Sequence, residues 1–239
     1  MVDLELVLAV DVSNSVDHVE ASWQREGYAD ALGDPAVLAA IASGPNARIA
    51  VTYVEWAGQG YQRKIIDWMI IANKGDAALF SHRLRSSGRS SGRSSAPYTS
   101  ISAAIDFARR EFIGNRFSGQ RRVIDISGDG PNSAGRDVRD ARDDAVREGI
   151  TINGMPILSF RANPLGGTPA TGLDLYFARN VIGGDGAFVI EANMLEKFSV
   201  ALVKKLVREI NPPDRVKLAF RAASQPLKTA ERHRLAKHP

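Results

Sequence analysis

Short apolar runs alternate along this chain with stretches in which apolar residues recur every three or four positions. The runs predict strands at about 4–10, 47–56, 64–72, 121–128, 150–157 and 187–191. The recurring spacing predicts helices at 16–32, 76–85, 99–113, 136–148, 173–180 and 194–210. Strands that alternate with helices in this way are typical of a mostly parallel sheet with helices on both faces.

One pair of strands departs from this alternation. The runs at 47–56 and 64–72 are separated by only a few residues around Gly58-Gln59-Gly60, too few for a parallel crossover. We therefore expect a doubly wound, six-stranded α/β sheet with one antiparallel edge strand. If its order is 3-2-1-4-5-6, the switch point lies between the first and fourth strands, where such sheets bind ligands.

The helix predicted at 16–32 has a recognisable apolar side. Val16, Val19 and Trp23 fall on one face at helical spacing. We expect this face to pack against the sheet.

Oxygen-bearing side chains follow the first strand directly. Asp11, Ser13 and Ser15 alternate along the backbone after the apolar run at 6–10. This alternation directs three oxygen ligands to one point just beyond the strand, where a hard cation can bind.

Two further segments add oxygen atoms of the same kind. The strand predicted at 121–128 ends at Asp129, which lies between two glycines that allow the backbone to turn sharply. Thr99 lies at the start of the helix predicted at 99–113, and we expect its hydroxyl to be free.

Together these three segments resemble the metal-ion-dependent adhesion site (MIDAS) of von Willebrand factor A (vWA) domains. In that family Asp-x-Ser-x-Ser, a Thr from a second loop and an Asp from a third surround one Mg²⁺ or Mn²⁺. The resemblance implies the ligand set Asp11, Ser13, Ser15, Thr99 and Asp129, in family order.

The resemblance extends over about residues 3–210 and looks closest to a bacterial subgroup of vWA-like proteins. It also implies the six-stranded vWA architecture. One departure stands at Ser127-Gly128, where many members have an apolar residue and Thr before the Asp.

Each of these residues also has a plainer explanation. Ser13 and Ser15 are good N-caps for the following helix, Thr99 is a possible cap, and Asp129 suits a turn. Their combination on three loops at the switch point favours the metal site. Asp125, inside a strand, is interpreted as a hydrogen-bonded core residue rather than a ligand.

The composition permits one sizeable domain. A chain of 239 residues with 44% hydrophobic content can bury a full core, which we place at 1–211. The basic segment at 212–239 is expected to be a flexible tail, because it has a single aromatic residue and no recognised nucleic-acid motif. The formal net charge of +4 therefore does not indicate a nucleic-acid partner.

Compartment is only loosely constrained. The absence of cysteine excludes disulfides and thiolate chemistry. No run of about 18 apolar residues predicts a membrane span, and no signal peptide precedes the first strand. We expect a periplasmic or secreted protein whose signal was removed, with a cytoplasmic location as the alternative.

A repeated Arg-Ser-Ser-Gly pattern occupies residues 83–96. It has no apolar residue after Leu84, so residues 85–95 are predicted to be a mobile, solvated connector. The alternative is a cationic arm that attracts acidic partners to the rim of the metal site.

Binding is favoured over catalysis. None of the four histidines lies in the motifs, the phosphohydrolase pattern Asp-x-Asp is missing, and no Gly-rich phosphate loop is present. We expect a Mg²⁺- or Mn²⁺-dependent protein-binding module, not an enzyme, whose metal takes an Asp or Glu carboxylate from a partner. The alternatives are a metal-assisted hydrolase of anionic small molecules and a structural envelope component with a lapsed site.

Overall fold

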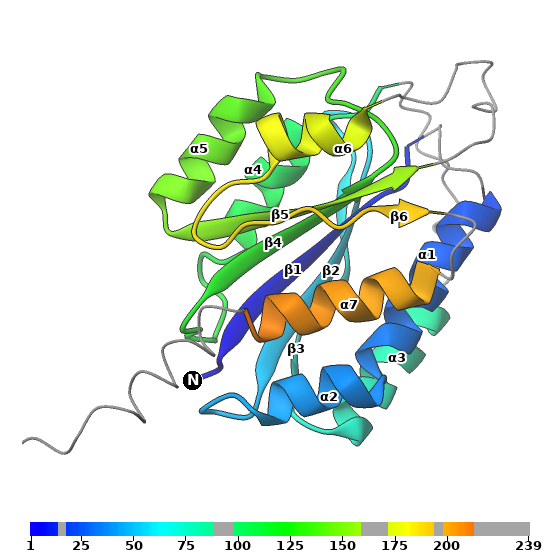
Figure 1. Cartoon of the computed structure of the whole chain (residues 1–239), viewed down its shortest axis with the longest axis vertical. Helices are drawn as coiled ribbons and strands as arrows, with labels where there is room; N and C mark the ends of the chain where they lie inside the picture. Colours follow the sequence, from blue (N-terminus) through cyan, green and yellow to red (C-terminus); the bar gives the residue numbers. More distant parts are fainter. Residues whose placement is uncertain (14–17, 88–97, 159–171, 194–197, 213–239) are drawn as a thin grey trace, which may run out of the picture.

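The computed structural model describes residues 1–13, 18–87, 98–158, 172–193 and 198–212 (Figure 1). They form a six-stranded sheet of order β3-β2-β1-β4-β5-β6. Its strands are β1 (Leu4–Asp11), β2 (Ile49–Trp56), β3 (Gln62–Ile71), β4 (Arg122–Gly128), β5 (Ile150–Leu158) and the two-residue β6 (Ala192–Asn193).

The pairing follows the predicted pattern. β1 pairs in parallel with β2 and β4, and β5 continues the parallel sheet between β4 and β6. Only β3 runs antiparallel among the described strands, as the edge partner of β2. The mostly parallel sheet with one antiparallel edge strand is therefore confirmed, and its order turns back between β1 and β4.

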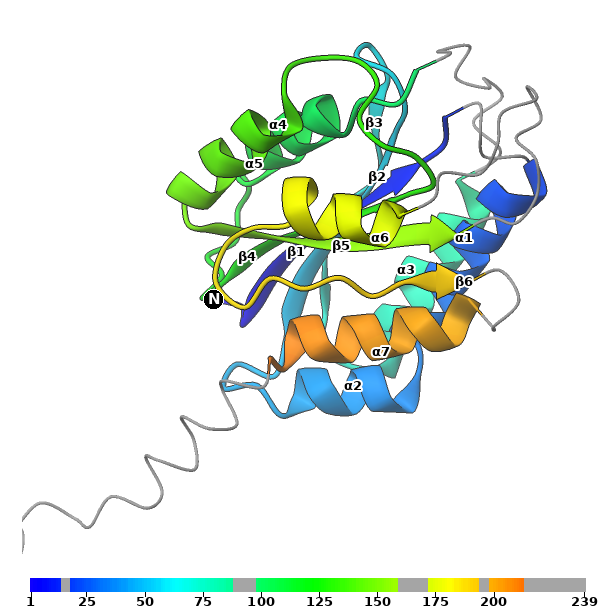
Figure 2. The same ribbon diagram turned by 45° about the horizontal axis from the view of Figure 1, so that its top comes forward.

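Helices cover both faces of the sheet (Figure 1 and Figure 2). One face carries α1 (His18–Leu32), α2 (Pro35–Ala42), α3 (Lys74–Ser86) and α7 (Phe198–Ile210). The other carries α4 (Ile101–Glu111), α5 (Val138–Arg147) and α6 (Leu173–Tyr176), which continues into the π-helical turn η1 (Phe177–Val181). None of the described helices combines the length and the apolar run needed to cross a bilayer.

The central strand explains why the two layers hold together. Every residue of β1 is buried, with Leu6 and Leu8 facing α1 and α7 and Val7 and Ala9 facing α4 and α5. A parallel strand enclosed on both faces needs such a continuous apolar run, which is the pattern seen in the sequence.

Two elements differ from the predictions. α2 was not predicted, although Asp34 accepts a hydrogen bond from the Ala36 N–H at 2.8 Å and Pro35 occupies the first turn, a standard helix start. The last strand lies at 192–193 instead of 187–191. Within the predicted range 187–191, one isolated bridge joins Val189 to Gly154. The neighbouring Phe188 N–H donates to the Asn153 side chain (3.2 Å) and so does not extend the backbone pairing.

The apolar face predicted for the first helix is also wrong at one residue. Trp23 is 46% exposed, and the buried side of α1 instead carries Tyr28, Ala29 and Leu32. Val16 and the side chain of Val19 lie outside what the structure describes.

The predicted mobile connector does not begin at residue 85. α3 extends through Arg85, which pairs with Glu26 and Asp30 of α1. Residues 88–97 of the connector, and the tail from 213, lie outside the described residues.

A buried charge cluster fastens α7 to the sheet. Lys205 and Asp125 are fully buried and form an ion pair, and Lys205 Nζ also lies 2.6 Å from Glu209 Oε1. Asn153 of β5 donates a hydrogen bond to the same Glu209 oxygen at 3.2 Å. Asp125 is thus a paired core residue, as its position within the strand predicted.

The cluster holds two carboxylates and one ammonium group in a dry environment. Burial raises the pKa of Glu209 to about 7, although Lys205 acts in the opposite direction. Burial also raises the pKa of Asp125 despite the same ammonium group. Burial alone would lower the pKa of Lys205, but the two carboxylates have the larger effect, so the pKa of Lys205 is raised.

Glu209→Gln should remove part of the pH dependence of stability. The folded-state pKa of about 7 lies above the ordinary value of 4.5, so wild type loses stability as pH rises through this window. In urea denaturation we expect the Glu209→Gln variant to gain on the order of 2 kcal/mol relative to wild type between pH 5 and pH 8.

The exposed Glu191 offers a matched control. Glu191→Gln should stay within about 0.5 kcal/mol of wild type at both pH values. If the free energies of unfolding of wild type and Glu209→Gln differ by the same amount at both pH values, Glu209 does not have the raised pKa described here.

Candidate metal centre

The two predicted aspartates lie at adjacent strand ends. Asp11 is the last residue of β1, and Asp129 follows β4 directly. In the sheet Val10 is paired with Ser127, so the two chains leave the sheet side by side at the switch point. Ligands of doubly wound sheets bind in this crevice.

The Asp11 carboxylate is completely buried. Its Oδ1 accepts a hydrogen bond from the Ser13 backbone N–H at 2.8 Å, and Oδ2 has no hydrogen-bond partner among the described residues. Gln24 of α1 reaches the same turn, with its Nε2 3.4 Å from the Asp11 carbonyl oxygen. A dry carboxylate oxygen without a donor is costly unless something positive binds it.

Electrostatics point in the same direction. Burial raises the pKa of Asp11 well above its ordinary value, and the negative charge of Asp129 raises it further. Polar contacts with Ser13 and with the Asp129 backbone lower the pKa of Asp11 without cancelling these effects. Asp129 itself is partly exposed, whereas Asp11 is completely buried.

Thr99 lies one residue before the cap of α4. Ser100 is the N-cap, and its hydroxyl accepts the Ala103 N–H at 3.4 Å, so the capping explanation for Thr99 does not hold. A Cβ placed on Gly130 would lie 3.8 Å from Thr99 Oγ1, which brings the Thr99 hydroxyl next to the Asp129 loop.

Hydrogen bonds hold the Thr99 loop against the loop after β4. The Thr99 carbonyl accepts the N–H groups of Ser133 (2.8 Å) and Ala134 (3.2 Å), and the Thr99 N–H donates to Ser133 Oγ at 3.0 Å. Asn132 Oδ1 accepts the Ser102 N–H at 2.9 Å, in the loop-forming role expected of Asn. These contacts position Thr99 through its backbone.

Four of the five predicted residues therefore come together. Three segments at the carboxyl ends of β1 and β4 bring together Asp11, Ser13, Thr99 and Asp129. Ser15 lies outside the described residues. Sequence reasoning missed the supporting residues Gln24, Trp56 and Ser133. No local motif marks them, because they approach the site only through folding.

The departure from the family pattern at Gly128 has a steric reason. A Cβ at Gly128 would lie 3.0 Å from Asp11 Oδ2 and 3.4 Å from the Trp56 ring. The Trp56 indole, fully buried, occupies the side of Gly128 on which a side chain would project. A side chain at residue 128 would press against the buried carboxylate, which would have to move by a few tenths of an ångström.

These features fit a hard divalent cation. Two carboxylates and neutral hydroxyls are the oxygen donors that Mg²⁺ prefers, and a cation next to Asp11 would offset both its burial and the charge of Asp129. Within the described residues no cluster of three or more His, Cys, Asp or Glu forms a competing metal site.

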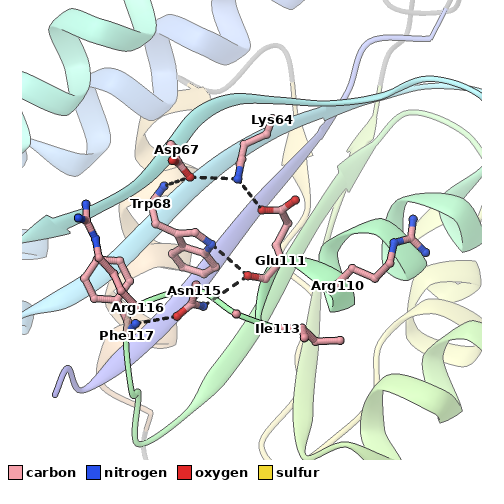
Figure 3. Close-up of a pocket in the computed structure, with 10 residues that line it drawn as sticks. Lys64, Asp67, Trp68, Arg110, Glu111, Ile113, Asn115, Arg116 and Phe117 are labelled. Carbon is pink, nitrogen blue, oxygen red and sulfur yellow. Dashed lines mark hydrogen bonds and ion pairs between the residues drawn. The ribbon is translucent and has the colours of Figure 1, made fainter.

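A separate cleft of about 480 Å³ lies between β3 and the loop that follows α4 (Figure 3). It lies near the start of β1, because Asn115 on its wall donates to Glu5 at 2.7 Å. Both carboxylates that line it already bind one lysine, because Lys64 pairs with Asp67 (3.0 Å) and Glu111 (3.1 Å). This cleft therefore differs from the Asp11 end of the sheet, where a buried carboxylate oxygen lacks a donor.

A family model described as a protein of unknown function (DUF1194) matches residues 1–214. No curated protein sequence is significantly similar to the chain. Several solved structures share its fold. The pilus adhesin SpaC from Lactobacillus rhamnosus GG has a TM-score of 0.59 at 12% identity, over 88% of this chain and 30% of that one.

Two further structures carry the family resemblance. Proximal thread matrix protein 1 from the mussel byssus, with a zinc-occupied MIDAS motif, has a TM-score of 0.56 at 15% identity, over 86% of this chain and 46% of that one. The SpRpn10 VWA domain has a TM-score of 0.54 at 11% identity, over 86% of this chain and 95% of that one. These likenesses confirm the vWA fold, while the chain spans less than half of the adhesin and the byssus protein.

In metal-free buffer, Asp11→Asn should be more stable than wild type at pH 8. The raised pKa of Asp11 means that its charge destabilises the folded state increasingly as pH rises above the ordinary value of 3.8. Asn keeps the oxygen that accepts the Ser13 N–H and removes the charge. Urea unfolding in EDTA at pH 8 and pH 4.5 measures the difference, which should shrink at the lower pH.

The control is Asp185→Asn, an exposed residue that should stay within about 0.5 kcal/mol of wild type. If Asp11→Asn is less stable than wild type at pH 8, the charge at Asp11 is not the destabilising feature described here.

Proposed function

We propose that this chain, which belongs to the DUF1194 family, is a divalent-metal-dependent protein-binding module. The observation that carries this proposal is the fully buried Asp11 carboxylate, whose Oδ2 has no hydrogen-bond partner in the described part of the chain, placed beside Asp129 at the switch point of the sheet. A bound cation would offset the cost of burying the Asp11 charge next to Asp129.

Asp11, Ser13, Ser15, Thr99 and Asp129 would hold the metal, which we propose to be Mg²⁺ or Mn²⁺. Both carboxylates and all three hydroxyls are hard oxygen donors. A cation bound there supplies a positive centre at a partly exposed position, because Asp129 and Thr99 are both partly exposed. The mussel protein with a zinc-occupied MIDAS supports divalent-metal binding by this fold.

The partner would contribute an Asp or Glu carboxylate. Mg²⁺ takes six ligands and retains water where the protein does not reach, so a position facing solvent remains available for exchange. A carboxylate is the protein group best suited to replace water there, since it carries a charge and an oxygen donor together. The pilus adhesin among the structural relatives supports an adhesion-type role.

Catalysis is the second candidate, and the described residues favour it less. Turnover at such a metal needs a general base close by. His82 lies on α3, on the face of the sheet away from the side chain of Asp11. The side chain of His18, at the start of α1, lies outside what the structure describes, as do His233 and His238. The alternative stays a metal-assisted hydrolase of anionic small molecules.

We also propose that the functional unit is the segment 1–211, with a basic tail from 212, and that it acts in the periplasm or after secretion. The family match over residues 1–214 supports the first boundary. The likeness to the pilus adhesin supports the second.

Metal binding should raise the melting temperature. A ligand that binds only the folded state stabilises it by about 2.7 kcal/mol at 100 times its dissociation constant. For a chain of this length that corresponds to roughly 5–10 °C. Thermal melts with saturating Mg²⁺ or Mn²⁺ and with EDTA measure the shift, which should vanish in Asp11→Asn and persist in Asp185→Asn.

Partner capture separates binding from catalysis. Immobilised wild type should retain at least one protein from a cell lysate in Mg²⁺ and release it in EDTA, while Asp129→Asn should retain none and Asp185→Asn should behave as wild type. Asp129→Asn acts at a surface loop, so its fold should be intact by circular dichroism. Metal-dependent turnover of phosphoesters, esters or peptides that disappears in Asp129→Asn would instead establish the hydrolase.

A further inference from the structure

Trp56 lies beside the Asp11 carboxylate in the sheet. The two residues are register partners between β1 and β2, and the Trp56 carbonyl accepts the Val12 N–H at 2.8 Å. In parallel strands register partners direct their side chains to the same face, so the indole and the carboxylate share the face covered by α4 and α5.

The indole ring reaches past Asp11 to the neighbouring strand on the other side. Its Cη2 and Cζ2 atoms lie 3.4 Å from the position that a Cβ of Gly128 would occupy. The same position is 3.0 Å from Asp11 Oδ2. The Trp56 ring and the buried oxygen therefore both border the space that a side chain at residue 128 would fill.

We infer that Trp56 and Gly128 are positioning residues for the metal centre: together they restrict the Asp11 carboxylate to one orientation. The Ser13 N–H fixes Oδ1, and the wall formed by Trp56 and Gly128 limits Oδ2. A carboxylate fixed in this way does not have to be ordered when a cation binds, so less free energy is lost on binding. This inference rests on the proposed metal-binding function.

Gly130 provides an internal comparison. It follows Asp129 in the chain as Gly128 precedes it. Among the described residues, a Cβ at Gly130 would meet only Thr99 Oγ1, at an ordinary contact distance of 3.8 Å. Both glycines have backbone conformations open to alanine, since neither has a positive φ. Gly128→Ala and Gly130→Ala thus add the same methyl group next to the same aspartate, and only the first displaces Asp11.

A metal-free measurement tests the positioning itself. In EDTA, hydrogen exchange followed by NMR should show the Ser13 amide protected in wild type and in Gly130→Ala, because its N–H donates to the fixed Asp11 Oδ1. In Gly128→Ala the displaced carboxylate should loosen this bond, and the Ser13 amide should exchange at least about 10 times faster. Urea midpoints monitor global stability, so that a general loss of folding is recognised.

Metal affinity tests the consequence. Calorimetric titration with Mg²⁺ or Mn²⁺ should give a Kd about 10 times weaker for Gly128→Ala, the size usual when a residue that supports a metal ligand is changed. Gly130→Ala should stay within about 3-fold of wild type. Adding Trp56→Phe to Gly128→Ala, which removes the ring atoms that reach residue 128, should recover part of the affinity.

The outcomes separate the two claims. If wild type binds neither metal, the proposed function fails, while the exchange of Ser13 still decides whether Trp56 and Gly128 hold the carboxylate. If wild type binds metal but Gly128→Ala and Gly130→Ala match each other in Ser13 exchange and in Kd, the positioning inference is overturned and the metal site stands.

Discussion

The burial of one carboxylate beside another is the constraint on which the site depends. Asp11 lies at the end of the central strand, so it is enclosed by β2 and β4 and by helices on both faces. Its exposed fraction is 0%, which leaves the charge poorly solvated, and Asp129 adds a second negative charge nearby. The sheet order that buries Asp11 also brings Asp129 to it. The chain places β2 and β3 on one side of β1 and then returns to place β4 on the other side, which makes β1 and β4 neighbours.

The opposite face of the sheet resolves a similar problem with protein groups alone. There Asp125 and Glu209 share the ammonium group of Lys205, and Asn153 supplies a further donor. Such a cluster contributes little net stability compared with apolar packing, but it strongly disfavours any arrangement in which one charge loses its partners. It therefore selects a single position of α7 on the sheet. At the Asp11 end, the protein holds carboxylates without an equivalent lysine among the described residues, which is the contrast expected between a structural cluster and a binding site.

The comparisons and the geometry contribute different things to the functional argument. Structures that are 11–15% identical establish the vWA fold and leave function open, because a fold hosts many activities. The proposal of a metal-dependent binding module comes from the chemistry of particular atoms. These are a buried oxygen with no hydrogen-bond partner among the residues described, a second carboxylate on a partly exposed residue, and the hydroxyl of a threonine whose backbone is held by the neighbouring loop. The adhesin and byssus relatives agree with that proposal.

The sequence by itself determined the elements and the candidate ligands. Periodicity is a local property, so the buried run of β1, the hairpin of β2 and β3, and the oxygen donors after each strand were all readable in the chain. The start of α2 was readable as well, since Asp34-Pro35 is a helix-starting pair. Tertiary structure alone decided what surrounds those donors. Trp56, Gly128 and Ser133 act across strands and loops that are far apart in sequence, and Trp23 is exposed because α1 packs through Tyr28. Distances between side chains on different strands depend on register and twist, which no local pattern encodes.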